Sequence, residues 1–282
     1  MSIEVIGVVG AGTMGSGIAQ MFAENGLTTR LWDRTEELTR RGVDAIRKRL
    51  DKSVEKGTMS ADAAAGSLAR LHPASNIAEF VDADLVIEGI FEDSAAKTAL
   101  YRQIEEVVGA GTLIGTNTSS LSVTELASAL ARPERFIGLH FFNPPTRLAL
   151  VEVITTPAFQ AGRLQEVNDL LQSCGKQPVT VKDSPGFIVN RLLLPLINEA
   201  ARLVDSGVAS PADIDAAMRL GTLHPAGPLQ VADLIGLDIC CDILQKLASS
   251  LDNPNYLPAA ALTSRVASGK LGRKSGAGFY TY

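Results

Sequence analysis

A histidine and a glutamate separated by twelve positions have the strongest potential for acid–base chemistry in this sequence. His140 lies near the end of one apolar run, and Glu152 is the only carboxylate inside the next, residues 150–154. An isolated buried carboxylate is costly, so Glu152 needs a partner, and His140 meets that need if the two runs form neighbouring strands. Such a carboxylate would fix the imidazole tautomer and raise its basicity, which predicts a general base. The alternative is a purely structural hydrogen bond; the other histidines, His72 and His224, precede prolines and are expected in loops.

A glycine-rich segment near the N-terminus has the spacing of a dinucleotide-binding turn. Gly10-Ala11-Gly12-Thr13-Met14-Gly15 follows an apolar run and precedes a helical pattern, and Asp33 ends the next apolar run. Gly10 permits a tight turn, Gly12 a close approach to a pyrophosphate, and Gly15 close packing of helix on strand, while the helix N-terminus attracts phosphate. All six turn residues are therefore candidate cofactor contacts. Asp33 suits ribose hydroxyls and favours NAD, although adjacent Arg34 leaves room for NADP, and the alternative is a structural turn with an incidental aspartate.

Two polar clusters add candidates for ligand binding. Asn117 and Ser119 follow an apolar run, at the carboxyl end of a predicted strand, which is where open α/β sheets bind ligands. The alternative is that Ser119 or Ser120 caps a helix that begins near Val123. Asn190 lies one turn into a later helix among apolar residues, which predicts an inward-facing amide near an interdomain crevice or a plain interface hydrogen bond.

The elements that position these residues alternate between strands and helices over the first two thirds of the chain. Apolar runs predict strands at 3–9, 29–32, 85–90, 112–116, 137–142, 150–154 and 178–181. Helical spacing predicts helices at 15–25, 36–56 and 95–108. Because the runs lack strict alternation and are separated by helices, they favour a parallel sheet covered on both faces, in a Rossmann-type doubly wound α/β fold.

The pattern becomes wholly helical after Val181. Helices are predicted at 187–205, with Pro185 at the first helical position, and at 212–220, 231–250 and 259–268. We therefore expect a Rossmann-type NAD-binding domain over residues 1–183 and an all-α C-terminal domain over residues 184–282.

Composition excludes several classes of function. The chain has 282 residues, with 26 Lys and Arg against 31 Asp and Glu, so its formal net charge is −5. This balance disfavours binding to nucleic acid or to an anionic membrane. Three unpatterned cysteines, Cys174, Cys240 and Cys241, predict neither disulfides nor a metal site. With neither a secretory signal nor a membrane helix in the pattern, we expect a cytoplasmic protein.

Together these motifs resemble those of the L-3-hydroxyacyl-CoA dehydrogenase family, and in particular its short 3-hydroxybutyryl-CoA dehydrogenase type. The resemblance covers nearly the whole chain. It is carried by the glycine-rich turn, by Asn117-Thr118-Ser119-Ser120-Leu121, by His140-Phe141-Phe142-Asn143-Pro144, by Asp183-Ser184-Pro185-Gly186-Phe187-Ile188-Val189-Asn190-Arg191, and by Leu271-Gly272-Arg273-Lys274-Ser275-Gly276.

The resemblance implies a role for each candidate residue. His140 would accept the 3-hydroxyl proton while hydride leaves C3 for the nicotinamide, and Glu152 would orient it. Ser119 and Asn190 would hold the substrate oxygens and the nicotinamide end. Further cofactor contacts are implied at Glu92, Lys97, Asn117, Asn143 and Lys274, and a coenzyme A contact at Lys56. Lys56 ends a basic helical segment that suits CoA phosphates, with a merely solvated face as the alternative, and the family implies a homodimer formed through the helical domain.

Two segments depart from the family pattern, and one of them is Phe91-Glu92-Asp93-Ser94, which varies the usual run of an acid followed by asparagine. After the His140 motif, most members have a Val-Pro-Val-Met-like tetrad, whereas this chain has Pro145-Thr146-Arg147-Leu148. Arg147 can change the acyl selectivity or bind a carboxylate or phosphate. The leading hypothesis is an NAD-dependent dehydrogenase of short-chain (S)-3-hydroxyacyl-CoA. The alternatives are a dehydrogenase of a free 3-hydroxy acid, such as a sugar acid or carnitine, and a non-catalytic nucleotide-binding protein.

Overall fold

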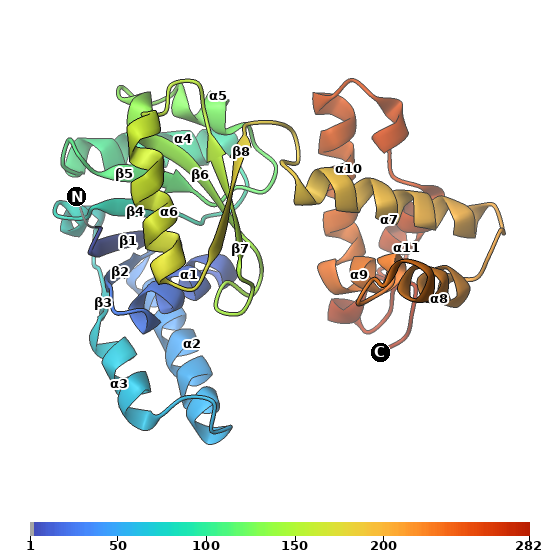
Figure 1. Ribbon diagram of the computed structural model, residues 1–282, viewed down its shortest axis with the longest axis horizontal. Coiled ribbons are helices and arrows are strands. Elements are labelled where there is room, and N and C mark those ends of the chain that lie inside the picture. The colour runs from blue at the N-terminus through green and yellow to red at the C-terminus, as the bar shows by residue number, and fades with distance from the viewer. Residues whose placement is uncertain (1–2) are drawn as a thin grey trace. The chain divides into compact units, whose positions relative to one another are not determined.

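The computed structural model describes residues 3–282, and the chain divides between Ser184 and Pro185 into two units. The first unit contains one eight-stranded sheet with helices on both faces, and the second unit is helical (Figure 1). This architecture confirms the expected Rossmann-type sheet followed by an all-α region.

The sheet has the strand order β3-β2-β1-β4-β5-β6-β7-β8. Its strands are β1 (Val5–Val9), β2 (Thr28–Trp32), β3 (Leu71–Pro73), β4 (Leu85–Glu88), β5 (Leu113–Thr116), β6 (Phe136–Phe141), β7 (Leu150–Thr155) and β8 (Gln177–Lys182). All neighbouring strands run parallel except β6 and β7, which are antiparallel. Residues 142–149 join β6 to β7, and so short a connection has no room for a crossover helix, so the chain must turn back on itself.

Strand β3 is the one strand of the sheet that the apolar runs miss. It has three residues and pairs only with β2, at the edge of the sheet. The prediction that His72 lies in a loop is wrong, because His72 is the central residue of β3. An edge strand tolerates the following Pro73, since a missing N–H there breaks no interior ladder.

Helices of the first unit cover both faces of the sheet. They are α1 (Thr13–Glu24), α2 (Glu36–Glu55), α3 (Ala61–Ala69), α4 (Ser94–Val107), α5 (Val123–Ala127) and α6 (Leu164–Ser173), with short 3₁₀ helices at Ile77–Phe80, Pro133–Arg135 and Ala161–Arg163. Apolar side chains of α1, α2, α3 and α6 form one core with strand residues such as Val8 and Leu139. On the opposite face, Tyr101 of α4 packs edge-on against Phe136 of β6, with 4.8 Å between ring centroids. The sequence pattern did not predict α3 or α6.

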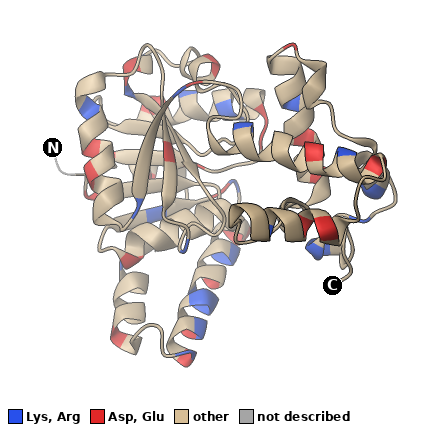
Figure 2. Cartoon of the chain, turned by 45° about the vertical axis from the view of Figure 1, so that its right-hand side comes forward, with Lys and Arg blue, Asp and Glu red and all other residues tan. Residues whose placement is uncertain are grey.

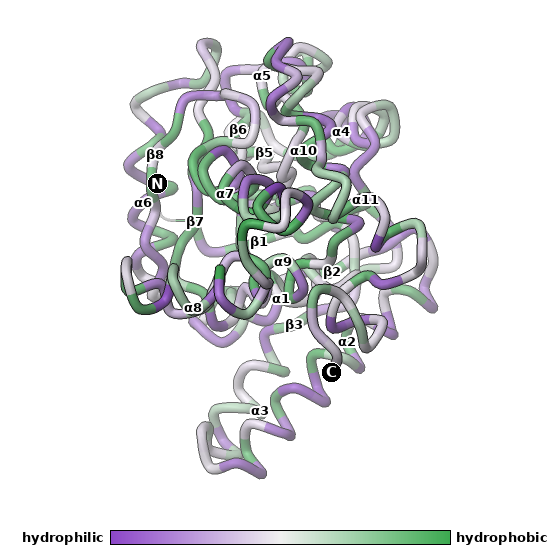
Figure 3. The backbone as a smooth tube through the Cα atoms, turned by 90° about the vertical axis from the view of Figure 1, so that its right-hand side faces the viewer, coloured by the Kyte–Doolittle hydropathy of each residue, from purple (hydrophilic) through white to green (hydrophobic). Residues whose placement is uncertain are grey.

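Polar side chains set where these helices begin. Thr35, Ser60, Asp93 and Ser122 accept backbone N–H bonds at the first turns of α2, α3, α4 and α5. Figure 3 shows hydrophilic and hydrophobic positions alternating along α2, as expected of a helix with one buried side.

The second unit contains five α-helices among residues 185–282. They are α7 (Val189–Asp205), α8 (Pro211–Thr222), α9 (Pro228–Ile235), α10 (Leu237–Ser250) and α11 (Ala260–Ala267), with 3₁₀ turns at Pro254–Tyr256 and Arg273–Ser275. Their shared core includes Leu194, Ile197, Leu229 and Leu244, all fully buried. His224 lies between α8 and α9, outside both helices, as expected.

Two boundaries in the second unit differ from prediction. Pro185 is not the first helical residue, because Gly186 and Phe187 have φ values of +75° and +50° and α7 begins only at Val189. The single helix predicted over 231–250 is two helices, since Gly236 has φ +107° and separates α9 from α10.

Two buried aspartates attach the C-terminal segment to the helices of the second unit. Asp233 accepts the N–H groups of Phe279 and Tyr280, and Asp215 accepts the Tyr280 hydroxyl at 2.6 Å. Across the described part of the chain, none of the helices combines the length and apolar character needed to cross a membrane.

Candidate active site

His140 and Glu152 face each other across the antiparallel strands β6 and β7. The strand register pairs them directly, and Nδ1 of His140 lies 2.7 Å from Oε2 of Glu152. Both side chains are buried, with exposed fractions of 6% and 1% for the two residues. Because Glu152 engages Nδ1, any proton transfer by this ring would use Nε2. The ring also packs against Phe142, at 4.4 Å between centroids.

The glycine-rich turn joins β1 to α1 with no space for side chains at two of its glycines. Gly10 has φ +101°, and a Cβ there would lie 2.7 Å from the Gly89 carbonyl oxygen. A Cβ on Gly15 would lie 1.8 Å from the Gly10 carbonyl oxygen, which no rearrangement of a side chain relieves. At Gly12, by contrast, a Cβ would meet nothing within 4 Å, so the backbone there is open to a ligand.

The start of α1 suits the pyrophosphate of a dinucleotide. Gly12 is the N-cap, so no side chain occupies the N–H groups of the first turn, and that turn carries no acidic residue. Asp33 is fixed beside it: one carboxylate oxygen accepts the Ala11 N–H at 2.7 Å and the other accepts the Arg34 N–H at 2.7 Å. In this fold, a carboxylate at the end of β2 accepts hydrogen bonds from the ribose hydroxyls of the dinucleotide, so these residues fit NAD.

Helix α2 contributes a contact that the sequence analysis did not identify. Gly42 is buried against the turn, and a Cβ there would lie 2.7 Å from Cβ of Ala11 and 2.9 Å from its carbonyl oxygen. A glycine within a helical pattern is the signal that points to such a position, because it lowers helix stability unless close packing requires it.

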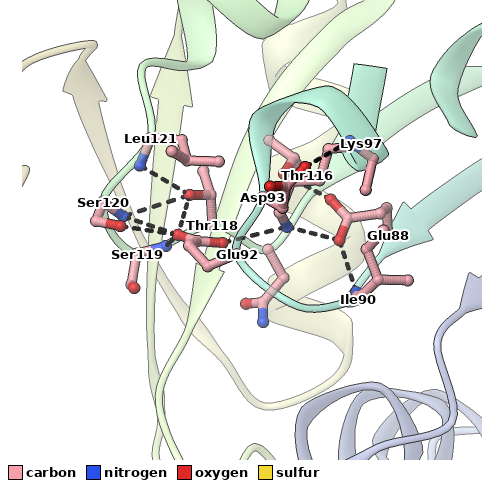
Figure 4. A network of polar contacts seen from close by, with 12 residues as sticks. Glu88, Ile90, Glu92, Asp93, Lys97, Thr116, Thr118, Ser119, Ser120 and Leu121 are labelled. Carbon is pink, nitrogen blue, oxygen red and sulfur yellow. Dashed lines mark hydrogen bonds and ion pairs between the residues drawn. The ribbon is translucent and has the colours of Figure 1, made fainter. Parts of the chain in front are cut away.

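Glu92 organises the loop that carries Ser119 and Ser120 (Figure 4). Its Oε1 accepts the backbone N–H groups of Ser119 at 3.0 Å and Ser120 at 3.2 Å, and the hydroxyl of Thr118. Burial raises the pKa of Glu92, but the Lys97 ammonium and these hydrogen bonds outweigh it and hold the pKa below its usual range. Neither Ser119 nor Ser120 caps α5, because Ser122 does.

Asn117 connects this loop region to the strand that carries His140. Its backbone N–H donates to the Glu88 carbonyl, and its side-chain oxygen accepts the Phe141 N–H at 2.9 Å. The structure therefore brings five of the predicted site elements to one edge of the sheet: the glycine-rich turn, Asp33, the Glu92 loop, Asn117 and the His140–Glu152 pair.

The other predicted site residues lie in different settings. Asn143 is exposed between β6 and β7, Lys97 is fully buried, and Lys56 is exposed at the C-terminal end of α2. Asn190 and Lys274 belong to the second unit, where Asn190 is 9% exposed and the Lys274 ammonium pairs with Asp238 at 2.6 Å.

Helix α2 is less basic than the run of arginines and lysines suggested. Figure 2 shows both signs of charge along it, and residues 36–55 contain six basic and five acidic side chains, a net charge of +1. Arg41 also pairs with Glu37 and Arg40 with Asp44. The helix as a whole therefore adds little net positive charge for an anionic ligand.

Glu88, at the end of β4, is a second residue that the sequence analysis did not identify. It is fully buried and contacts Lys97 at 2.6 Å. Its signal was the same as that of Glu152, namely a lone carboxylate in the apolar run 85–90. The described residues contain no group of three or more His, Cys, Asp or Glu side chains arranged to hold a metal ion.

Comparisons with known proteins show which family the chain belongs to. Residues 5–184 match the family model of the 3-hydroxyacyl-CoA dehydrogenase NAD-binding domain, and residues 186–282 match that of its C-terminal domain. Probable 3-hydroxybutyryl-CoA dehydrogenases of Deinococcus radiodurans and Bacillus subtilis are each 43% identical, over 98% and 100% of this chain and 99% and 98% of theirs. The crystal structure of (S)-3-hydroxybutyryl-CoA dehydrogenase from Ralstonia eutropha superimposes with a TM-score of 0.96 at 42% identity, covering 100% of this chain and 99% of that one.

These matches confirm the resemblance inferred from the sequence motifs. Both family models together span nearly all of the chain, and the relatives match it from end to end. The chain therefore belongs to the 3-hydroxyacyl-CoA dehydrogenase family and is an NAD-dependent oxidoreductase that acts on the CH–OH group of 3-hydroxyacyl-CoA.

Proposed function

We propose that the chain oxidises short-chain (S)-3-hydroxyacyl-CoA, such as 3-hydroxybutyryl-CoA, reversibly to 3-oxoacyl-CoA, with His140 as the general base. The observation that carries the proposal is the buried His140–Glu152 pair at the carboxyl edge of the sheet, with 2.7 Å between Nδ1 and Oε2. The names of the relatives from Deinococcus radiodurans, Bacillus subtilis and Ralstonia eutropha support a four-carbon acyl group.

The geometry supports one task for each side chain. Nε2 of His140 takes the proton of the 3-hydroxyl group, and Glu152 stabilises the resulting imidazolium through Nδ1. Bound NAD supplies the hydride acceptor. Ser119 and Asn190 orient the substrate oxygens, and Asp33 accepts the ribose hydroxyls, which excludes a 2′-phosphate by charge repulsion and favours NAD over NADP.

Further contacts are part of the same proposal. Glu92, Asn117, Asn143 and Lys274 also contact the cofactor, and the fully buried Lys97 acts on it through Glu92. Lys56 contacts coenzyme A. The protein forms a homodimer through the apolar helices of the second unit. It functions in the cytoplasm.

The test compares two histidines of the same unit. Purified wild type, His140→Ala and His72→Ala are assayed with acetoacetyl-CoA and NADH, following NADH absorbance. Loss of a positioned general base costs about 10²–10⁴-fold in rate, so His140→Ala should lose that much kcat. His72→Ala is the matched control, because His72 is exposed on the edge strand β3 and should retain wild-type turnover.

A substrate panel tests the thioester. The ratio kcat/KM is measured for 3-hydroxybutyryl-CoA, free 3-hydroxybutyrate, carnitine and a sugar acid. Preference for any free acid over the thioester overturns the proposed substrate, and unchanged turnover in His140→Ala overturns the assignment of the base.

A further inference from the structure

Glu88 gathers four hydrogen-bond donors at a point with no access to solvent. Its Oε1 accepts the Ile90 N–H and the Lys97 ammonium, both at 2.6 Å. Its Oε2 accepts the hydroxyls of Tyr101 at 2.5 Å and Thr116 at 2.9 Å. Glu88 and all three of these side-chain donors have exposed fractions of 0%. A carboxylate is kept in such a place only when its partners offset the cost of burial, and the proposed reaction steps do not use it.

Lys97 links Glu88 to Glu92 by pairing with both carboxylates. The ammonium lies between the two carboxylates, 2.6 Å from Oε1 of Glu88 and 3.3 Å from Oε2 of Glu92. Since Lys97 is fully buried, it has no solvent to replace either partner. The other oxygen of Glu92 holds the N–H groups of Ser119 and Ser120, so a continuous chain of charged contacts runs from Glu88 to that loop.

Glu88 also fixes the backbone beside the glycine-rich turn. By accepting the Ile90 N–H, it holds the intervening Gly89 in place. Gly89 lies against the turn: a Cβ on it would be in ordinary van der Waals contact with Cα of Gly15, at 3.5 Å, and its carbonyl oxygen blocks any Cβ on Gly10. One buried carboxylate therefore sets the position of both the glycine-rich turn and the Ser119 loop.

We propose that Glu88 is a positioning residue for the bound dinucleotide and for the reacting groups, acting through Lys97 on Glu92 and through Ile90 on the glycine-rich turn. The part that concerns the Ser119 loop rests on the proposed function. Glu88 need not touch cofactor or substrate to do this.

The variant Glu88→Gln separates charge from shape. Its amide oxygen must occupy the Oε1 position, because an NH₂ group there would meet the Lys97 ammonium and the Ile90 N–H. Lys97 then has one charged partner instead of two and is drawn towards Glu92. The Glu92 carboxylate turns towards Lys97 and away from Ser119, so the loop loses its anchor.

The matched control is Glu105→Gln on the same helix, two turns beyond Lys97. Glu105 is also a shielded carboxylate with charged and backbone donors: it accepts the Ala131 and Arg132 N–H groups at 2.7 and 2.9 Å and the Arg135 guanidinium at 3.1 Å. Both variants should lower the thermal midpoint. Only Glu88→Gln should raise the NADH Kd, by about tenfold, equal to one lost hydrogen bond, and lower kcat by about 10–100-fold.

A double-mutant cycle tests the route through Glu92. If Glu88 acts through that side chain, Glu88→Gln combined with Glu92→Gln lowers kcat no further than Glu92→Gln alone, whereas independent effects multiply and overturn the proposal. Equal effects of Glu88→Gln and Glu105→Gln on NADH Kd also overturn it, since they indicate a structural role alone.

Two further measurements distinguish failure of the Glu88 proposal from failure of the proposed function. NADH affinity, measured by fluorescence titration, needs no turnover, so it judges Glu88 even if the wild type fails to turn over any thioester and the proposed function falls. If Glu88→Gln does not fold, Tyr101→Phe removes one of the four donors and leaves the charge. It should raise the NADH Kd about threefold, and an unchanged Kd overturns the proposal.

Discussion

Replacing Gly42 by alanine tests whether helix α2 determines the shape of the glycine-rich turn. Glycine in a helix interior is normally a weakness, and an exposed Gly→Ala change there stabilises by about 0.5–1 kcal/mol. Gly42 is buried, and its Cβ would lie 2.7 Å from Cβ of Ala11, 2.9 Å from the Ala11 carbonyl oxygen and 3.2 Å from Leu31. Two of these three neighbours belong to the turn itself and cannot move as a flexible side chain does.

The clash is expected to reverse the sign of the substitution. Inserting a methyl group into a packed contact costs about 1–3 kcal/mol, and the gain in helix propensity returns up to about 1 kcal/mol. The net expectation for Gly42→Ala is a loss of about 1–2 kcal/mol, which is a fall of about 2–8 °C in Tm for a unit of this size. Because α2 must move away from Ala11, whose N–H is bonded to Asp33, the NADH Kd should rise about tenfold or more.

Gly66→Ala is the matched control in the neighbouring helix α3. The nearest atom to its Cβ would be the end of the Arg70 side chain at 3.4 Å, and that flexible group can move aside. Gly66→Ala should therefore stabilise the chain slightly and leave the NADH Kd unchanged. Thermal unfolding and NADH titration of both variants decide the matter: a Gly42→Ala protein as stable as Gly66→Ala, with wild-type affinity, would refute the reasoning.

Three other predictions concern Glu92, Cys240 and Asp233. Glu92→Gln should lower the free energy of unfolding by about 1–3 kcal/mol near neutral pH. Since the pKa of Glu92 is lowered in the folded state, its contribution is present above the unfolded value near 4.3 and is lost as the pH falls through the folded value; urea unfolding should show the gap from wild type narrowing in acid, and a constant gap contradicts this. Burial raises the pKa of Cys240 to about 12, so this thiol should stay unmodified by a disulfide reagent at about pH 8 until urea is added, and rapid native labelling at Cys240 would be contrary to expectation. Asp233→Asn should release the C-terminal segment and accelerate chymotryptic cleavage near Tyr280, while an unchanged cleavage rate would show that the segment is held by other contacts.

Three of the strands that the sequence revealed are buried on both faces. Apart from Glu88 and His140, β4, β5 and β6 consist of apolar or small residues with almost no access to solvent, so each appears as a nearly continuous apolar run. Helix α3 was missed for the opposite reason: only Ala64 and Ser67 are buried in it, and such small side chains produce no marked helical periodicity. The break between α9 and α10 depends on the backbone conformation of one glycine, Gly236. The apolar periodicity continues across this position, so it does not reveal the break.

The candidate site could be predicted where a charged residue lies within an apolar run. Glu152 attracted attention as a carboxylate in an apolar run, and its pairing with His140 then needed only that the two strands be neighbours. The same reasoning applies to Glu88, whose partners were harder to find. Lys97 and Tyr101 come from the following helix, and Thr116 comes from the next strand. These residues therefore form no short sequence motif from which the cluster could be predicted.

The contacts of Glu92 show why the remaining geometry could not be deduced from spacing. Its hydrogen-bond donors Thr118, Ser119 and Ser120 lie 26–28 residues away, and they become neighbours only because β4 and β5 are adjacent and parallel, with Glu88 in register with Thr116. The resemblance to the family named Glu92 and Lys97 alike as cofactor contacts, but their burial separates them: the Lys97 side chain is 0% exposed and that of Glu92 is 26% exposed. A lysine with no exposed surface influences a ligand only through its neighbours unless it moves, so its effect on NAD should be carried by the Glu92 carboxylate and should disappear when that carboxylate is neutralised.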